Sequence, residues 1–193
     1  LRRERVAAAL IGRGLDGAEA AGRVALLDRS VSAFRAAVGR DPIWGWIVPG
    51  RIEIFGKHTD YAGGRSLVAA VPRGFAVVGA PRGDGIVTAR DAHWPGSVEI
   101  DLADTRRKFH GWSNYVAVTA RRLAANFPGA PLGIDITFGS DLPRAAGVSS
   151  SSALVVGIAL ALVHRGALRE RPDRKSTRLN SSHVSESRMP SSA

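Results

Sequence analysis

Four consecutive serines, Ser149 to Ser152, stand between a glycine and a long apolar stretch in the segment GVSSSSALVVGIALALV. A helix that begins here needs only one serine as its N-cap, because one side-chain oxygen can accept a hydrogen bond from a free N–H of the first turn. A helix N-terminus also carries partial positive charge, and further hydroxyls add hydrogen-bond donors and possible metal ligands. The segment therefore has two interpretations, a capped helix or an anion site.

A second polar cluster, KHTDY at residues 57–61, follows a strand-like segment and precedes a Gly-Gly pair. Its donors and acceptors could bind the hydroxyls of a polar small molecule. The alternative is a polar turn in which Asp60 hydrogen-bonds to its own backbone.

The loop LPRAAG, before the serines, is not a Walker A motif because no Gly-Lys-Ser/Thr follows it. Its small residues would still let the backbone approach a ligand closely at a helix N-terminus. Taken together, the two loops offer hydroxyl recognition, a free arginine at Arg51 and a phosphate cradle. A sugar kinase needs all three.

Hydrophobic periodicity predicts the elements that must position these loops. Apolar residues at i, i+3 and i+4 spacing predict helices over 24–38 and 112–127, each followed by Gly and Pro. The serine run opens a further helix over 149–165, which is apolar on all sides and should be buried between layers. Segments rich in β-branched residues and bounded by turn residues predict strands at 44–55, 66–71, 75–80, 85–90, 97–102 and 133–138.

The alternation around Arg51 assigns two faces to its strand. Arg51, Glu53 and Phe55 share one face, and Ile52 and Ile54 share the other. The order of the elements, mostly strands before the later helices, predicts an α+β fold rather than an alternating doubly wound sheet.

Composition narrows the possible function classes. The 193 residues carry a formal net charge of +10, but the arginines are spread along the chain with no basic stripe interleaved with aromatics, which disfavours a nucleic-acid partner. No run of about 18 uncharged apolar residues occurs, so we expect no membrane span. The basic N-terminus lacks the features of a secretory signal, and the absence of cysteine excludes disulfides and thiolate metal sites. These features predict a cytoplasmic protein.

Three motifs, in one order, resemble those of the galactokinase-type GHMP kinases. PGRIEIFGKHTDYAGG resembles the sugar-binding signature Pro-Gly-Arg-x-Asn-x-Ile-Gly-Glu-His-Thr-Asp-Tyr, and GWSNYVAV resembles a Trp-x-Asn-Tyr-Val segment. LPRAAGVSSSSAL resembles the phosphate loop Pro-x-Gly-x-Gly-Leu-Ser-Ser-Ser. The resemblance runs from about Pro42 to Leu162 and includes APRGDGIVTARDA between the motifs.

This resemblance implies a fold, a reaction and a set of site residues. The fold would be α+β, the GHMP kinase N-terminal domain (ribosomal protein S5 domain 2-like), with the C-terminal domain missing. The reaction would be ATP-dependent phosphorylation of a sugar, usually at the anomeric hydroxyl, with a sugar, ATP and Mg²⁺ as the small-molecule partners. Arg51 would stabilise the transferring phosphoryl group, Trp112 would lie against the adenine and Ser151 would bind Mg²⁺. The sugar pocket would comprise Lys57, His58, Thr59, Asp60 and Tyr61, and the phosphate loop Ala145, Ala146, Gly147, Val148, Ser149, Ser150 and Ser151.

The sequence departs from the family pattern at three positions. Glu53 stands where the family has Asn, and Lys57 where it has a sugar-binding Glu. An ammonium group only donates hydrogen bonds, whereas a carboxylate accepts them, so the bound sugar is expected to differ from galactose. Alternatively, Glu53 and Lys57 pair with each other. Ala145 replaces the first loop glycine, which alters the loop if that position needs a positive φ.

The resemblance also implies that the chain lacks the family's catalytic Asp, its acidic Mg²⁺ ligand and its third glycine-rich motif. We therefore expect an inactive N-terminal part of a sugar kinase. A catalytically inactive sensor of sugar and ATP is the alternative, and a basic nucleic-acid-binding protein is a third hypothesis.

Three segments are expected along the chain. Residues 1–40 form an N-terminal helical segment, and residues 41–172 form the GHMP kinase N-terminal domain. Residues 173–193 have no apolar periodicity and would ordinarily indicate a disordered tail. Their first eleven residues, DRKSTRLNSSH, resemble the translation of a common sequencing adapter, so we expect this tail not to be protein in origin.

Overall fold

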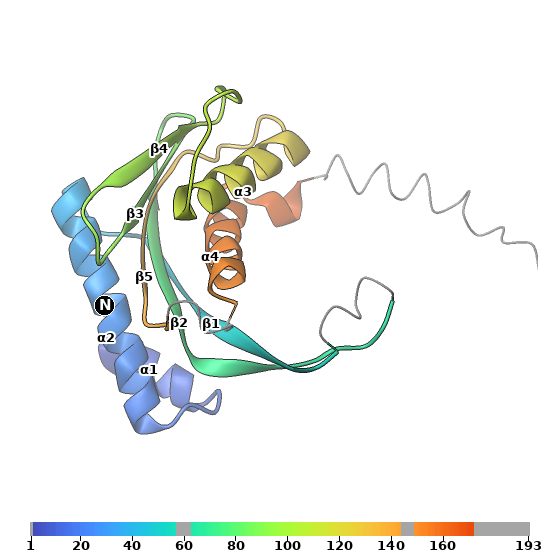
Figure 1. Cartoon of the computed structure of the whole chain (residues 1–193). Coiled ribbons are helices and arrows are strands. Elements are labelled where there is room, and N and C mark those ends of the chain that lie inside the picture. The colour runs from blue at the N-terminus through green and yellow to red at the C-terminus, as the bar shows by residue number, and fades with distance from the viewer. Residues whose placement is uncertain (1, 57–62, 144–148, 172–193) are drawn as a thin grey trace, which may run out of the picture.

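The computed structural model describes residues 2–56, 63–143 and 149–171. In this part of the chain a five-stranded sheet, in the order β1-β2-β5-β3-β4, lies between two helical layers (Figure 1). Its strands are β1 (Trp44–Phe55), β2 (Leu67–Pro81), β3 (Ile86–Asp91), β4 (Ser97–Asp101) and β5 (Ile134–Ser140). All neighbouring strands pair antiparallel except β3 and β5, which are parallel. The mixed sheet confirms the predicted α+β class.

One face of the sheet is covered by α2 (Gly17–Val38). The helix starts well before the predicted residue 24, because Asp16 and Glu19 form a reciprocal capping box at its N-terminus. Its core contacts lie against β2, where every second side chain points toward the helix. The buried residues of this layer are Leu26, Leu27, Val31, Phe34, Ala76, Val78 and Ala80.

The opposite face is covered by α3 (Trp112–Asn126) and α4 (Ser150–Arg165). Both helices begin and end close to the predicted positions, and α4 runs across β1 and β2. The prediction that α4 is buried on all sides is wrong for the part of the chain described here. Its inner face packs on the sheet through Leu154 and Ile158, whereas Val156 is 47% exposed.

The strand β2 is continuous, although two separate strands were predicted at 66–71 and 75–80. The intervening Pro-Arg-Gly predicted a turn, but it belongs to a bulge: residues 71–73 stand opposite Gly50 alone. A bulge accommodates Pro72, which has no N–H for the ladder. Gly74 follows immediately, and a Cβ there would lie 2.0 Å from the Val48 carbonyl oxygen, so this close approach needs glycine.

Beyond the bulge, β1 and β2 leave the body of the sheet as a two-stranded ribbon (Figure 1). The alternation of residue types in this ribbon assigned Ile52 and Ile54 to one face and Phe55 to the other, and both faces are exposed. Ile52 and Ile54 are 41% and 48% exposed, and Phe55 on the other face is 72% exposed. The ribbon therefore projects both of its faces away from the core.

Two shorter elements complete the described structure. The N-terminal helix α1 (Arg3–Ile11) packs on α2 without burying any residue fully, and the short 3-10 helix η2 (Leu168–Glu170) follows α4. No helix among the described residues has the length and apolar character needed to cross a membrane.

Candidate active site

The site forms where the exposed ribbon meets the start of α4. Arg51 lies on β1 just beyond the bulge, opposite Ala70 of β2. Its Nε donates a hydrogen bond to the Oγ of Ser149, at 3.3 Å. The contact joins two motifs that lie 98 positions apart in the sequence. The structure thereby brings together the predicted phosphoryl-binding arginine and the predicted phosphate loop.

Ser149 occupies the N-cap position of α4 but does not cap it with its side chain. Its backbone is left-handed, with φ 56° and ψ 40°, and its hydroxyl accepts from Arg51 instead of from a first-turn N–H. Ser150 is half-buried and Ser151 is exposed. The N–H groups of the first turn have no intrahelical partner. They point out of the helix N-terminus together with these hydroxyls, an arrangement suited to an anion.

A cavity of about 500 Å³ lies beside this helix terminus. Its lining includes Ser150 and Leu154 of α4 and Trp112 at the start of α3. The Trp112 ring meets Phe138 edge-on, with ring centroids 5.2 Å apart, which fixes the indole as one wall. Trp112 and the serine segment, predicted from separate motifs, therefore share one cavity.

The same cavity includes residues that sequence reasoning missed. Asp91 is the last residue of β3, His93 and Trp94 follow it, and Ser140 ends β5. Asp91 accepts a hydrogen bond from the His93 backbone N–H at 2.9 Å, and this turn holds the loop in place. The sequence contains one signal for this loop, the polar and aromatic pair His93 and Trp94 shortly after the predicted strand 85–90.

The remaining predicted site residues lie outside the described part of the chain. They are the sugar-pocket residues Lys57, His58, Thr59, Asp60 and Tyr61 and the loop residues Ala145, Ala146, Gly147 and Val148. The proposed pairing of Glu53 with Lys57 falls there too. Among described residues, no group of three or more His, Asp or Glu side chains could hold a metal ion.

Two family models match the chain over the elements that build this site. The galactokinase galactose-binding signature matches residues 32–81, and the GHMP kinase N-terminal domain matches residues 114–173. The first match contains Arg51 and the second contains Ser149, the two residues that meet in the structure. The chain belongs to the galactokinase-type GHMP kinases.

Curated relatives of this galactokinase-type chain agree with the assignment. It is 34% identical over 140 residues to the galactokinase of Canis lupus familiaris, and 39% identical over 115 residues to that of Roseiflexus sp. (strain RS-1). These matches cover 68% and 58% of this chain but 35% and 28% of the relatives. The chain thus spans about a third of the length of the curated relatives it matches.

Solved structures share the fold of this GHMP kinase N-terminal domain. Lactococcus lactis galactokinase complexed with galactose superposes with a TM-score of 0.60 at 28% identity, over 72% of this chain and 40% of that one. The Methanococcus jannaschii mevalonate kinase superposes with a TM-score of 0.53 at 15% identity, over 74% of this chain and 45% of that one. The second likeness concerns the fold alone.

Proposed function

We propose that the full-length gene product transfers the γ-phosphoryl group of ATP to a hydroxyl of a sugar, as a galactokinase-like kinase, and that residues 1–193 alone are inactive. The observation that carries the proposal is the hydrogen bond from Arg51 to Ser149, which puts a cationic side chain at an N–H-rich helix terminus. Phosphoryl transfer requires mainly positioning and charge neutralisation. A reaction that uses ATP fits the cytoplasmic localisation expected from the sequence, which we keep as part of the proposal.

In this proposal the chain's own residues bind and orient the two substrates. The ATP phosphates lie against the first turn of α4, the adenine occupies the cavity beside Trp112, and Arg51 offsets the negative charge that develops on the transferring group. The anomeric hydroxyl is our proposed acceptor, with the sugar bound by the segment from Lys57 to Tyr61.

Ser151 fits a role as a Mg²⁺ ligand. Its hydroxyl is a hard oxygen in the exposed first turn of α4, and Mg²⁺ in kinases binds few protein ligands alongside phosphate oxygens and waters. When bound there, Mg²⁺ would neutralise phosphate charge.

Replacement of Arg51 tests the proposed sugar kinase activity. The full-length gene product should phosphorylate a sugar with ATP, and Arg51→Ala should reduce kcat by about 10²- to 10³-fold, since one transition-state contact is lost. Arg122→Ala removes an exposed arginine on α3 and should leave kcat unchanged. An Arg51→Ala enzyme with normal kcat would refute the assigned role.

Binding without turnover would favour the alternative, a sensor of sugar and ATP. The departures at Glu53 and Lys57 are the observation that keeps this alternative open. Isothermal titration with ATP and with sugars, on the same full-length product, separates the two functions.

The acceptor itself is tested with a panel of neutral and acidic hexoses. We propose that Lys57 favours a sugar with an acceptor or acidic group, such as a uronic acid, because an ammonium group donates hydrogen bonds and attracts negative charge. Lys57→Glu should shift the preference toward neutral hexoses. An unchanged order of preference would mean that Lys57 is structural.

A further inference from the structure

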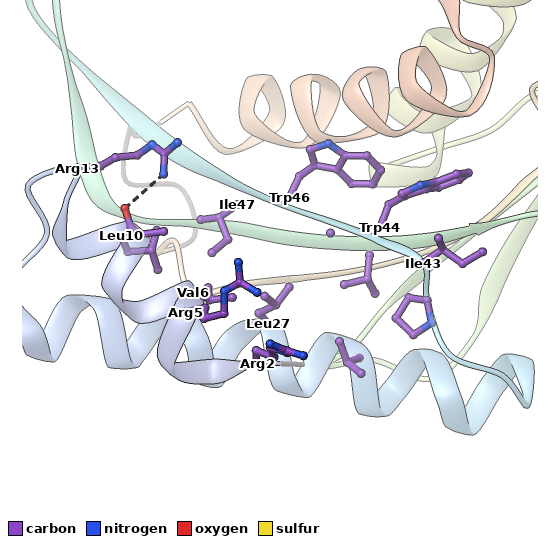
Figure 2. Close-up of a pocket in the computed structure, with 15 residues that line it drawn as sticks. Arg2, Arg5, Val6, Leu10, Arg13, Leu27, Ile43, Trp44, Trp46 and Ile47 are labelled. Atoms are coloured by element: carbon purple, nitrogen blue, oxygen red, sulfur yellow. Dashed lines mark hydrogen bonds between the residues drawn. The ribbon is translucent and has the colours of Figure 1, made fainter.

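Two further cavities lie on the far side of the sheet from the candidate active site. One, of about 460 Å³, lies between the N-terminal end of α2 and the bulge of β2. The other, of about 760 Å³, lies under α1 (Figure 2). Both are lined by Leu10, Arg13 and Ile47, so they adjoin and form one groove. Among the described residues, those assigned to ATP and phosphoryl transfer (Arg51, Trp112 and Ser149 to Ser151) line neither of them.

The smaller cavity contains a buried arginine with unused hydrogen-bonding capacity. Arg23 is only 4% exposed and pairs through Nη2 with the Oδ2 of Asp141. Its Nε and Nη1 are buried and have no hydrogen-bond partner among the described residues. The other oxygen of Asp141 is already engaged, because it accepts from the Gly74 backbone N–H at 2.8 Å. Buried donors without a partner are costly, so such groups usually meet a water or an ion.

Positive charge accumulates around this arginine. Arg13 and Arg73 line the same cavity, whereas Glu19, the one acidic residue among the described residues that line it, already accepts a hydrogen bond from the Asp16 backbone N–H. Burial lowers the pKa of the Arg23 guanidinium, and the charges of Arg73 and Arg29 lower it further, against a smaller opposite effect of Glu19. An anion in the cavity would relieve this repulsion between neighbouring positive charges.

The larger cavity is lined by Arg2, Arg5 and Arg13 and also by a set of aliphatic residues (Figure 2). Its floor is aliphatic, formed by Val6, Leu10, Leu27, Val31, Ile47 and Val78. The rings of Trp44 and Trp46 lie on the other side of β1, against His164 of α4 (Figure 2), so no aromatic face is available there to stack on a base. An aliphatic chain fits this surface better than a nucleotide does.

We propose that this groove binds an amphipathic anion, a carboxylate on a medium-length aliphatic chain. The head group occupies the cavity that Arg23 lines, and Arg13 and Arg73 flank it. The chain extends under α1 along the aliphatic floor. The groove is thus a second ligand site, independent of the proposed kinase activity.

Sodium decanoate is the probe, titrated calorimetrically into the 193-residue chain. Decanoate should bind at least about 10-fold more tightly than decanol, which lacks the charge, and than acetate, which lacks the chain. Its addition should also move the side-chain Nε–H resonance of Arg23 in a ¹⁵N NMR spectrum. Equal affinity for decanol and decanoate, or an unmoved Arg23 resonance, would overturn the proposal.

Two exposed arginines supply the variants, because a change at buried Arg23 could prevent folding. Arg73→Gln and Arg13→Gln should each weaken decanoate binding by about 10-fold, since each removes a charged donor near the head group. Arg122→Gln, on the other side of the sheet, should not affect it. Unchanged affinity in both Arg73→Gln and Arg13→Gln would contradict the site, whatever the outcome of the kinase assays.

Discussion

The serine segment illustrates how one residue type takes different roles at consecutive positions. Ser149 adopts a left-handed backbone and accepts a hydrogen bond from Arg51, while Ser151 remains exposed in the first turn of α4. The role of Ser149 was predicted from its motif, but its contact with Arg51 was not. A contact over 98 positions leaves no periodic signal in the sequence, because tertiary folding alone creates it.

Substitution of Ser151 tests its proposed role in binding Mg²⁺. In the full-length gene product, Ser151→Ala should lower kcat by about 10²-fold or more, because it removes an oxygen ligand near the transferring phosphoryl group. Ser152→Ala, at the next exposed hydroxyl, is the matched control and should retain normal turnover. Full activity of the Ser151→Ala enzyme at saturating Mg²⁺ would rule out the assignment.

An ion pair at the far end of the sheet makes stability depend on acid pH. Arg82 donates to both oxygens of Asp84, at 2.9 and 2.7 Å, and lowers the pKa of that carboxyl from 3.8 to about 2. Folding therefore favours the ionised form of the Asp84 carboxyl. The contribution of this ion pair to the free energy of unfolding is complete above pH 3.8 and is lost as the pH falls toward 2.

The Asp84→Asn variant isolates this contribution. Its free energy of unfolding should fall less steeply than that of the wild type between about pH 4 and pH 2, as measured by urea denaturation at several pH values. An NMR titration of Asp84 provides the direct measurement. A midpoint near the ordinary value of 3.8 would show that the pair with Arg82 has no effect on this carboxyl.

Elements were predicted well where local pattern and tertiary environment agreed. The helix α3 and the strands β3, β4 and β5 lie within a few residues of their predicted ranges, since their apolar residues face a core. Local pattern was misleading for β2, where Pro-Arg-Gly predicted a turn but forms a bulge inside a longer strand. The exposure of the ribbon could not be predicted from its alternation, because Ile52, Ile54 and Phe55 are all more than 40% exposed in the structure.

The close approach of β1 and β2 at the bulge predicts a strong effect of a single methyl group. Gly74→Ala places a Cβ 2.0 Å from the Val48 carbonyl oxygen and 2.8 Å from Pro49 Cα. Both neighbours are backbone atoms, so relief requires movement of the strands, and we expect a loss of about 3 kcal/mol in the free energy of unfolding.

Gly22→Ala is the control variant for Gly74→Ala, and the free energy of unfolding of both is measured by chemical denaturation. Gly22 lies inside α2 with nothing within 4 Å of its added Cβ, so alanine should stabilise the chain by about 0.5–1 kcal/mol through helix propensity. Equal stabilities of Gly74→Ala and wild type would mean that the two strands separate at the bulge without cost.

At the level of the whole chain, the resemblance predicted the family and the α+β fold class, because the three motifs occur in the order found in that family. The groove at Arg23 was not predicted. Its ion pair links α2 to the end of β5, and its cavity depends on a bulge and on the packing of α1. No short motif contains those residues, so only the folded chain brings them together.

The proposed division into segments gives a test on the whole molecule. We expect residues 173–193 to contribute nothing to folding, since they lack apolar periodicity and the GHMP kinase match stops at residue 173. Deletion of 173–193 should leave the thermal midpoint within about 1 °C of the intact chain, whereas a deletion from Leu160 removes the core residue Leu162 and should prevent folding. A large loss of stability on removing the tail would assign it a structural role.

The origin of the tail is tested separately, by amplifying the locus from source DNA. We expect codons different from those of DRKSTRLNSSH after about residue 172. Recovery of the same codons in frame would show that the segment is native.

The bulge in β2 also bears on how this domain can change over evolution. Side chains alternate along a strand, so a one-residue change of length normally reverses every face beyond it. Here residues 71–73 already interrupt the pairing between the core half of the hairpin and the ribbon that carries Arg51. Length variation in residues 71–73 would change which residue of β2 pairs with Arg51 of β1, while the core register stays fixed. Small insertions and deletions at the bulge would therefore alter the surroundings of the Arg51–Ser149 contact and leave the core of the fold unchanged.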